Sequence, residues 1–145
     1  MKPTRPRDLV LAAVLFGILG YLLLWWAYRS IPTLPRTASL SVVVIGVIEL
    51  QVATQTRRRL EGRPGTRPIL PLTVARLAAL AKASSVVGAA LAGAWAGVLG
   101  YTAPRTDEFP TAGGDAITAG FGLAAAVVLL VGGLVLERVC RVKKS

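Results

Sequence analysis

The sequence has no histidine and only one cysteine, Cys140, among its 145 residues. The lack of histidine removes the commonest general base and metal ligand, and a single cysteine cannot form an internal disulfide. Three of the seven carboxylates, Asp107, Glu108 and Asp115, fall in one short glycine-containing segment without the spacing of a calcium-binding loop. We expect Asp115 to cap the helix that follows. Without a nucleophile–base pair or a set of metal ligands, the sequence predicts no enzyme activity, no metal and no cofactor.

Negative charge is also scarce, since 7 acidic residues oppose 17 basic ones and the net charge is +10. A charge of this size can indicate binding to nucleic acid. The basic run at residues 57–59, however, adjoins a long apolar stretch and has no interleaved aromatic residues on which bases could stack. The segment around it is too short to fold as a binding module. We therefore expect no nucleic acid partner.

Long apolar runs dominate the chain, and 54% of its residues are hydrophobic. A run of about 20 such residues in a helix crosses a hydrocarbon core of roughly 30 Å. The remaining residues leave room only for short connections, so we expect one transmembrane domain over residues 1–145, an all-α, integral membrane four-helix bundle. The predicted spans are approximately residues 9–28, 37–56, 72–101 and 115–136.

The first apolar run could be mistaken for a secretory signal peptide. It is longer than the apolar part of such a signal, and it ends in Trp25 and Trp26 without a small-residue cleavage site. We expect a retained first span. Trp25, Trp26 and Tyr28 then form an aromatic anchor at the outer membrane interface.

The basic residues are distributed unequally between the two sides that four spans create. All of them except Arg29, Arg36 and Arg105 lie near the two termini or in the connection 57–71 and the adjoining start of the third helix. Positively charged connections face the cytoplasm in most membrane proteins. The sequence therefore predicts cytoplasmic N- and C-termini and a basic cytoplasmic connection at residues 57–71.

Glu49 interrupts an apolar run about 12 Å along the second helix from Arg57. A carboxylate at this depth costs at least about 2–3 kcal/mol unless it is paired, hydrated or protonated. If the second and third helices are antiparallel neighbours, Lys82 lies at nearly the same depth, so Glu49 and Lys82 are a candidate intramembrane pair. The pair could be a structural link between the two helices or a site that responds to protons or a substrate.

Small residues mark the surfaces where helices are expected to pack closely. Gly93 and Gly97 form a small-xxx-small pair that Ala89 extends by one turn, and Gly46 lies one turn before Glu49. We favour packing within one chain over packing between two copies. The pattern does not set the oligomeric state.

The arginines of the basic connection and of the helix after it have two interpretations. They could simply fix the topology, or they could bind anionic lipid, to which each contributes about 1 kcal/mol near a charged leaflet. Prolines at 64, 68 and 71 stiffen the connection, and Pro71 suits the first turn of a helix. An ordered basic surface could also bind a membrane or cytoplasmic protein. The candidate contact residues are Arg57, Arg58, Arg59, Arg63, Arg67 and Arg76.

Three segments, residues 2–6 (KPTRP), 62–68 (GRPGTRP) and 75–83 (ARLAALAKA), carry a family resemblance. The chain is similar over nearly its whole length to an uncharacterised actinobacterial membrane family, domain of unknown function 3180. This resemblance implies a small, multi-pass protein of the plasma membrane with four spans and no established activity.

Two functions follow as expectations. The first is a non-enzymatic accessory or scaffold component of the cell envelope, which binds anionic lipid or a protein partner through its basic cytoplasmic face. The alternative is a small transporter or transporter subunit that uses the Glu49–Lys82 site. The two halves of the chain show no convincing repeat of the kind that many transporters contain.

Overall fold

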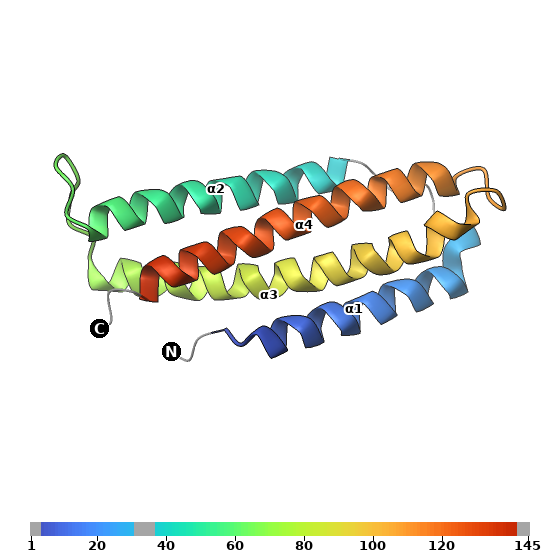
Figure 1. Ribbon diagram of the computed structural model, residues 1–145, viewed down its shortest axis with the longest axis horizontal. Coiled ribbons are helices and arrows are strands. Elements are labelled where there is room, and N and C mark those ends of the chain that lie inside the picture. Colours follow the sequence, from blue (N-terminus) through green and yellow to red (C-terminus); the bar gives the residue numbers. More distant parts are fainter. Residues whose placement is uncertain (1–3, 31–36, 142–145) are drawn as a thin grey trace.

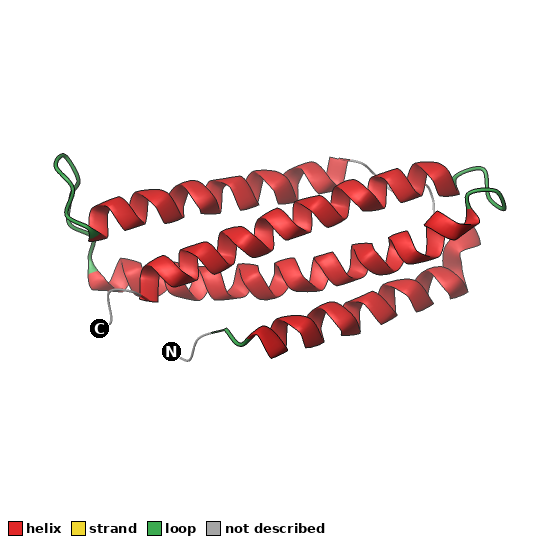
Figure 2. Ribbon diagram, viewed as in Figure 1, coloured by secondary structure: helices red, strands yellow, loops and turns green. Residues whose placement is uncertain are grey.

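The computed structural model describes residues 4–30 and 37–141. The described residues form helices and loops but no strand (Figure 2), which confirms the expected all-α class. Short 3₁₀ turns, η1 (Tyr28–Ser30) and η2 (Ala103–Arg105), follow the first and third long helices. The long helices are α1 (Pro6–Ala27), α2 (Thr37–Leu60), α3 (Pro71–Thr102) and α4 (Ala112–Arg141).

Proline begins two of these helices, and arginine extends a third. Pro6 and Pro71 are the first residues of α1 and α3, where the missing N–H costs nothing and the fixed φ suits a helix. At the end of α2 the helix continues through residues 57–59 to Leu60. Arginine is a good helix former, and positive charge is favourable at a helix C-terminus. The loop between α2 and α3 is therefore residues 61–70, shorter than the predicted connection 57–71.

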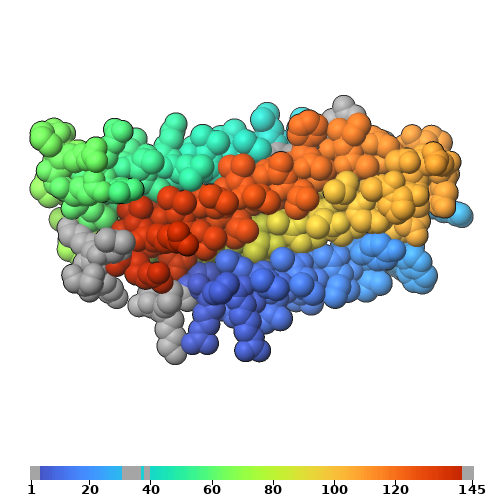
Figure 3. Space-filling model, viewed as in Figure 1, coloured from blue at the N-terminus to red at the C-terminus, as the bar shows by residue number. Residues whose placement is uncertain are grey.

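The four helices lie side by side in the order α2, α4, α3, α1 (Figure 1). The surface view shows α4 between α2 and α3 on one face of the molecule (Figure 3). Although α2 and α3 are antiparallel and joined by a short loop, each packs chiefly against α4. As a result, α1 and α2 occupy the two edges of the bundle.

The bundle has two chemically different ends. We call the end that holds the loop 61–70, the starts of α1 and α3, and the ends of α2 and α4 the basic end (Figure 1). The backbone N–H of Thr4 donates to Oε1 of Glu137 at 2.8 Å, which ties the segment before α1 to the last turns of α4. A buried cluster inside this end joins Ala53, Ala81, Leu136 and Cys140. We call the opposite end, around Tyr28 and Tyr101, the aromatic end.

Glycine allows the backbones of α1 and α3 to meet. A Cβ atom built on Gly93 would overlap the carbonyl oxygen of Ala13, and one on Gly97 would overlap that of Gly17. Gly20 of α1 makes the reciprocal approach, since its Cβ would lie 3.0 Å from the carbonyl oxygen of Ala94. Small residues commonly allow such contact between helices in membranes.

Glycine also mediates the contacts of α4 with its two neighbours. A Cβ on Gly46 of α2 would lie 2.9 Å from the backbone nitrogen of Leu129, and one on Gly88 of α3 would lie 2.6 Å from that of Leu130. From the other side, a Cβ on Gly133 would lie 2.8 Å from the nitrogen of Ser85. The centre of the bundle is thus built from backbone contacts rather than from large side chains.

The outer surface is strongly apolar. All four helices are long and apolar enough to cross a membrane. The edge helix α1 buries only Leu24, and most of its other large apolar side chains are exposed; Leu15 and Leu19, for example, are more than half exposed. Exposure of so large an apolar surface to water would be unfavourable, whereas its contact with lipid is not. The chain is a multi-pass membrane protein, in agreement with the expected membrane bundle.

The close contact between α1 and α3 can be tested with one added methyl group. Gly93→Ala should lower stability by about 1–3 kcal/mol, because the new Cβ forces the two backbones apart. Thermal unfolding in detergent should show this as a lower Tm.

Gly100→Ala on the same helix is the matched control. Nothing lies within 4 Å of a Cβ at that position, and alanine favours a helix over glycine by about 1 kcal/mol, so Tm should stay the same or rise. Equal Tm values for the two variants would contradict a contribution from the α1–α3 contact.

Candidate functional site

Glu49 is buried where three helices meet. Its side chain comes from α2 and is only 4% exposed. The hydroxyl of Ser84, on α3, donates to Oε1 of Glu49. On α4, the absent side chain of Gly132 makes room, since a Cβ there would lie 3.5 Å from Oε2 of Glu49. The carboxyl group therefore touches both of the helices that flank it.

The second carboxyl oxygen, Oε2, is buried and has no hydrogen-bond partner among the described residues. An ionised oxygen without a partner in a nonpolar interior is costly, whereas a protonated carboxyl or one that binds a small cation is not. The site can thus take up a proton or a cation. No group of three potential metal-ligating side chains occurs in residues 4–30 and 37–141.

Lys82 lies on a different side of α3 from Ser84. Residues two apart in a helix point about 200° away from each other. Lys82 instead shares its helix face with Gly93 and Gly97, the two glycines that meet α1. Its side chain is half-buried. The Glu49–Lys82 pair stays a prediction, and the residue that the structure places against Glu49 is Ser84.

The loop 61–70 at the basic end is folded into hydrogen-bonded turns. Gly62 and Gly65 adopt φ values of +63° and +83°, which side chains disfavour, and the N–H of Arg63 donates to the carbonyl of Arg58. Glu61 bridges two arginines through ion pairs with Nε of Arg57 at 2.7 Å and Nε of Arg63 at 3.1 Å.

These ion pairs favour the ionised form of the Glu61 carboxyl group. The hydrogen bond from Arg57, helped by the charge of Arg63, lowers the pKa of the exposed Glu61 carboxyl below its usual value. The stabilising effect of Glu61 is therefore present near neutral pH and is lost only as the pH falls through the lowered pKa. The other candidate contact residues, Arg58, Arg59, Arg67 and Arg76, are exposed around the loop and at the start of α3.

Aromatic rings and a buried aspartate organise the opposite end. The hydroxyl of Tyr28 donates to Oδ2 of Asp115 at 2.7 Å, and the Tyr28 ring lies 5.4 Å from that of Tyr101 and 5.3 Å from that of Phe109. The expectation that Asp115 caps the fourth helix is wrong, because α4 begins three residues earlier, at Ala112. Asp115 instead lies in the first turn and connects α4 to the end of α1.

Sequence reasoning missed Ser84 and the Tyr28–Asp115 contact for different reasons. Two adjacent serines at 84 and 85, at the start of the long apolar stretch that follows Lys82, were a usable signal for a polar contact near Glu49. The Tyr28–Asp115 bond joins residues 87 positions apart, and no local pattern points to it.

The four apolar helices and their short connections define a small four-span membrane protein. The chain belongs to the family described as Protein of unknown function (DUF3180), whose model matches residues 9–144. No curated protein and no solved structure matches it.

The contacts of Glu49 can be separated by double-mutant cycles. Ser84→Ala should lower the free energy of unfolding by about 1–3 kcal/mol, because it leaves Oε1 without its donor, and it should cost less in a Glu49→Met background. Ser85→Ala is the matched control, since that hydroxyl donates to a carbonyl of its own helix. Its effect should not depend on residue 49.

A second cycle, with Glu49→Gln and Lys82→Met, tests the predicted pair in the same unfolding assay. Contact between the two side chains requires a coupling of about 0.5 kcal/mol or more. Additive effects would show that the pair does not form.

Proposed function

We propose that this chain is a non-enzymatic accessory or scaffold protein of the plasma membrane that binds anionic lipid through its basic end. One observation carries the proposal: Arg58, Arg59 and Arg67 are exposed around an ordered loop, in which Glu61 pairs with Arg57 and Arg63 instead. A protein partner with an acidic surface would bind to the same face.

The orientation is part of the proposal. Both termini and the loop 61–70 face the cytoplasm, as the excess of basic residues at this end favours. The cytoplasmic leaflet is the more negatively charged one, so the arginines lie next to the phosphates that they are suited to bind.

The ordered structure of the loop supports lipid binding by the arginines over a role in fixing the topology alone. Glu61 holds Arg57 and Arg63 in place, and both glycine turns fix the path of the backbone between them. Arg58, Arg59 and Arg67 are thereby presented at defined positions. A preorganised cationic surface loses less entropy on binding than a flexible one.

A charge-removal experiment tests this proposal. Arg58→Gln, Arg59→Gln and Arg67→Gln together should weaken binding of phosphatidylglycerol by tenfold or more, since each arginine near anionic headgroups contributes about 1 kcal/mol. Native mass spectrometry of the purified protein can count bound phosphatidylglycerol and phosphatidylcholine.

The matched control removes the same charge from the same end with Arg5→Gln, Arg7→Gln and Arg138→Gln. It should keep most of the bound lipid. Equal losses from both triple variants would mean that net charge alone retains the lipid, and binding by the loop would be refuted. Labelling of Thr66→Cys and Thr106→Cys by an impermeant thiol reagent, in a Cys140→Ala background, checks that the orientation is unchanged.

A second candidate function is a small proton- or cation-conducting transporter or transporter subunit. The observation in its favour is Oε2 of Glu49, which is buried within the bundle and has no hydrogen-bond partner among the described residues. Carboxyl groups in this situation are common in proton pathways through membranes.

Proteoliposomes can test this candidate. In vesicles with an imposed pH gradient and an internal pH-sensitive dye, the wild-type protein should dissipate the gradient faster than Glu49→Gln, which cannot release a proton. The variant with Arg58→Gln, Arg59→Gln and Arg67→Gln should behave like the wild type. Equal rates for the wild type, Glu49→Gln and empty vesicles would exclude proton movement through this site.

A further inference from the structure

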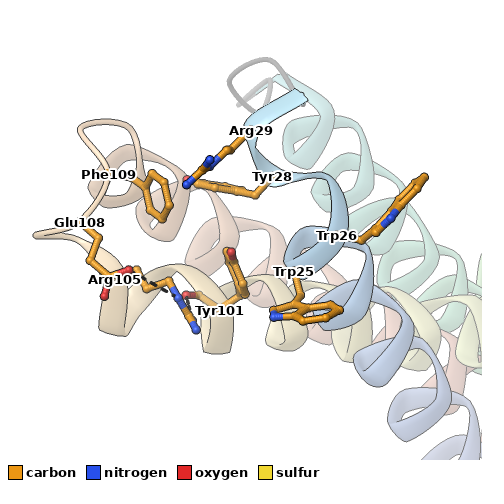
Figure 4. A pocket seen from close by; sticks show the side chains of 8 residues that line it. All are labelled: Trp25, Trp26, Tyr28, Arg29, Tyr101, Arg105, Glu108 and Phe109. Carbon is orange, nitrogen blue, oxygen red and sulfur yellow. Dashed lines mark hydrogen bonds and ion pairs between the residues drawn. The ribbon is translucent and has the colours of Figure 1, made fainter.

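A cavity of about 480 Å³ opens at the aromatic end of the bundle (Figure 4). Its walls come from the ends of α1 and α3, from both 3₁₀ turns and from the loop before α4. Five of the lining residues are aromatic: Trp25, Trp26, Tyr28, Tyr101 and Phe109. A volume of this size is within the usual range for small-ligand sites.

Ring contacts and a hydrogen bond hold the tyrosine wall of this cavity in place. Tyr101 is only 7% exposed, and its ring contacts those of Tyr21 and Tyr28 at 5.6 Å and 5.4 Å. The hydroxyl of Tyr28 is fixed by the buried Asp115. A preformed pocket loses little freedom when a ligand enters it.

Two arginines and one glutamate supply the charge. The guanidinium of Arg105 lies 4.3 Å from the centre of the Tyr101 ring, donates to the Tyr101 carbonyl at 3.0 Å, and has its Nε 3.8 Å from the carboxylate of Glu108. Arg29 on the other wall is exposed and forms no hydrogen bond or ion pair with the described part of the chain. Positive charge therefore exceeds negative charge in the pocket, and one guanidinium is available to an anion.

One side of the cavity is continuous with the apolar surface of the bundle. Trp25 is 68% exposed, and the preceding Leu22 and Leu23 are at least half exposed on α1. Trp26 turns away from the Tyr101 ring and is also exposed (Figure 4). Tryptophan is enriched where lipid meets water, so the cavity lies at the membrane interface.

We propose that this cavity binds the phosphate of an anionic phospholipid, with the acyl chains lying along α1 beside Trp25. The planar guanidinium groups of Arg29 and Arg105 suit phosphate oxygens, and the aromatic walls suit the glycerol backbone and the first methylenes of the chains. An apolar wall open to the membrane favours a lipid over a soluble phosphate. This site lies at the opposite end of the bundle from the proposed cytoplasmic lipid surface and is independent of it.

Glu108 provides a test that separates lipid binding by Arg105 from a structural role of Arg105. Its carboxylate faces Arg105 and competes with a bound phosphate for that guanidinium. Glu108→Gln should therefore tighten lipid binding, whereas a purely structural role for Arg105 would make the same substitution neutral or harmful.

Binding can be measured in detergent with short-chain phosphatidylglycerol, short-chain phosphatidylcholine and glycerol 3-phosphate. We expect the wild type to prefer the first over each of the others by at least tenfold. In the Arg58→Gln, Arg59→Gln, Arg67→Gln background, which removes the proposed binding at the basic end, Arg29→Gln should remove most of this preference, and Glu108→Gln should strengthen binding several-fold. Arg29→Gln should leave the fold unchanged, because Arg29 is exposed and has no hydrogen-bond or ion-pair partner within the described residues.

A phosphatidylglycerol with brominated chains can show where on the protein the lipid binds. Binding in the cavity should quench the fluorescence of Trp25 and Trp26, with a midpoint that Arg29→Gln shifts to higher lipid concentration and Arg58→Gln, at the basic end, leaves unchanged. The loop 61–70 contains no tryptophan, so binding there gives no such signal.

Three results would overturn the proposal. Equal binding of phosphatidylcholine would show that charge is not recognised, and equally tight binding of glycerol 3-phosphate would point to a soluble phosphate. Identical midpoints for the wild type and Arg29→Gln would show that the cavity is not the binding site.

Discussion

Helices that lie side by side in lipid gain nothing from hiding apolar side chains from water, so close contact between their backbones has to hold them together. This constraint explains why glycine appears at each of the three main interfaces: Gly93 and Gly97 between α3 and α1, Gly88 and Gly133 between α3 and α4, and Gly46 between α2 and α4. Each interface brings main-chain atoms within van der Waals reach. The large apolar side chains, freed from the interior, cover the surface that lipid contacts.

The same close packing creates the setting of Glu49. Gly46, one turn before Glu49 on α2, and Gly132, which faces the carboxyl group from α4, let the two helices approach closely and leave Glu49 only 4% exposed. A looser interface would admit water and would make an ionised carboxylate tolerable. The chemical character of this group, a carboxyl with one donor and one oxygen without a partner in the described chain, is therefore a consequence of glycine packing and not of Glu49 alone.

The number and type of helices were predictable because length and hydropathy act locally: each apolar run has to form its own backbone hydrogen bonds in lipid. The order in which the helices pack was not predictable from the same pattern, because hydropathy does not specify which apolar helix contacts which. Glu49 stood out because its charge is costly in any arrangement, whereas Ser84 became relevant only once α2 and α3 were placed. The start of α4 was misjudged because two glycines, Gly113 and Gly114, suggested a loop where the chain is already helical.

The order in which the helices pack differs from the order in which a ribosome makes them. The main partner of α1 is α3, and that of α2 is α4, which is synthesised last. Each of the first two helices is therefore made before the helix that it mainly packs against. The absence of that partner costs little for the strongly apolar α1. It costs more for α2, the least apolar of the four, because α4 does not yet cover the Glu49 carboxyl group. Membrane insertion of α2 should therefore be less favourable before α4 is made than after it.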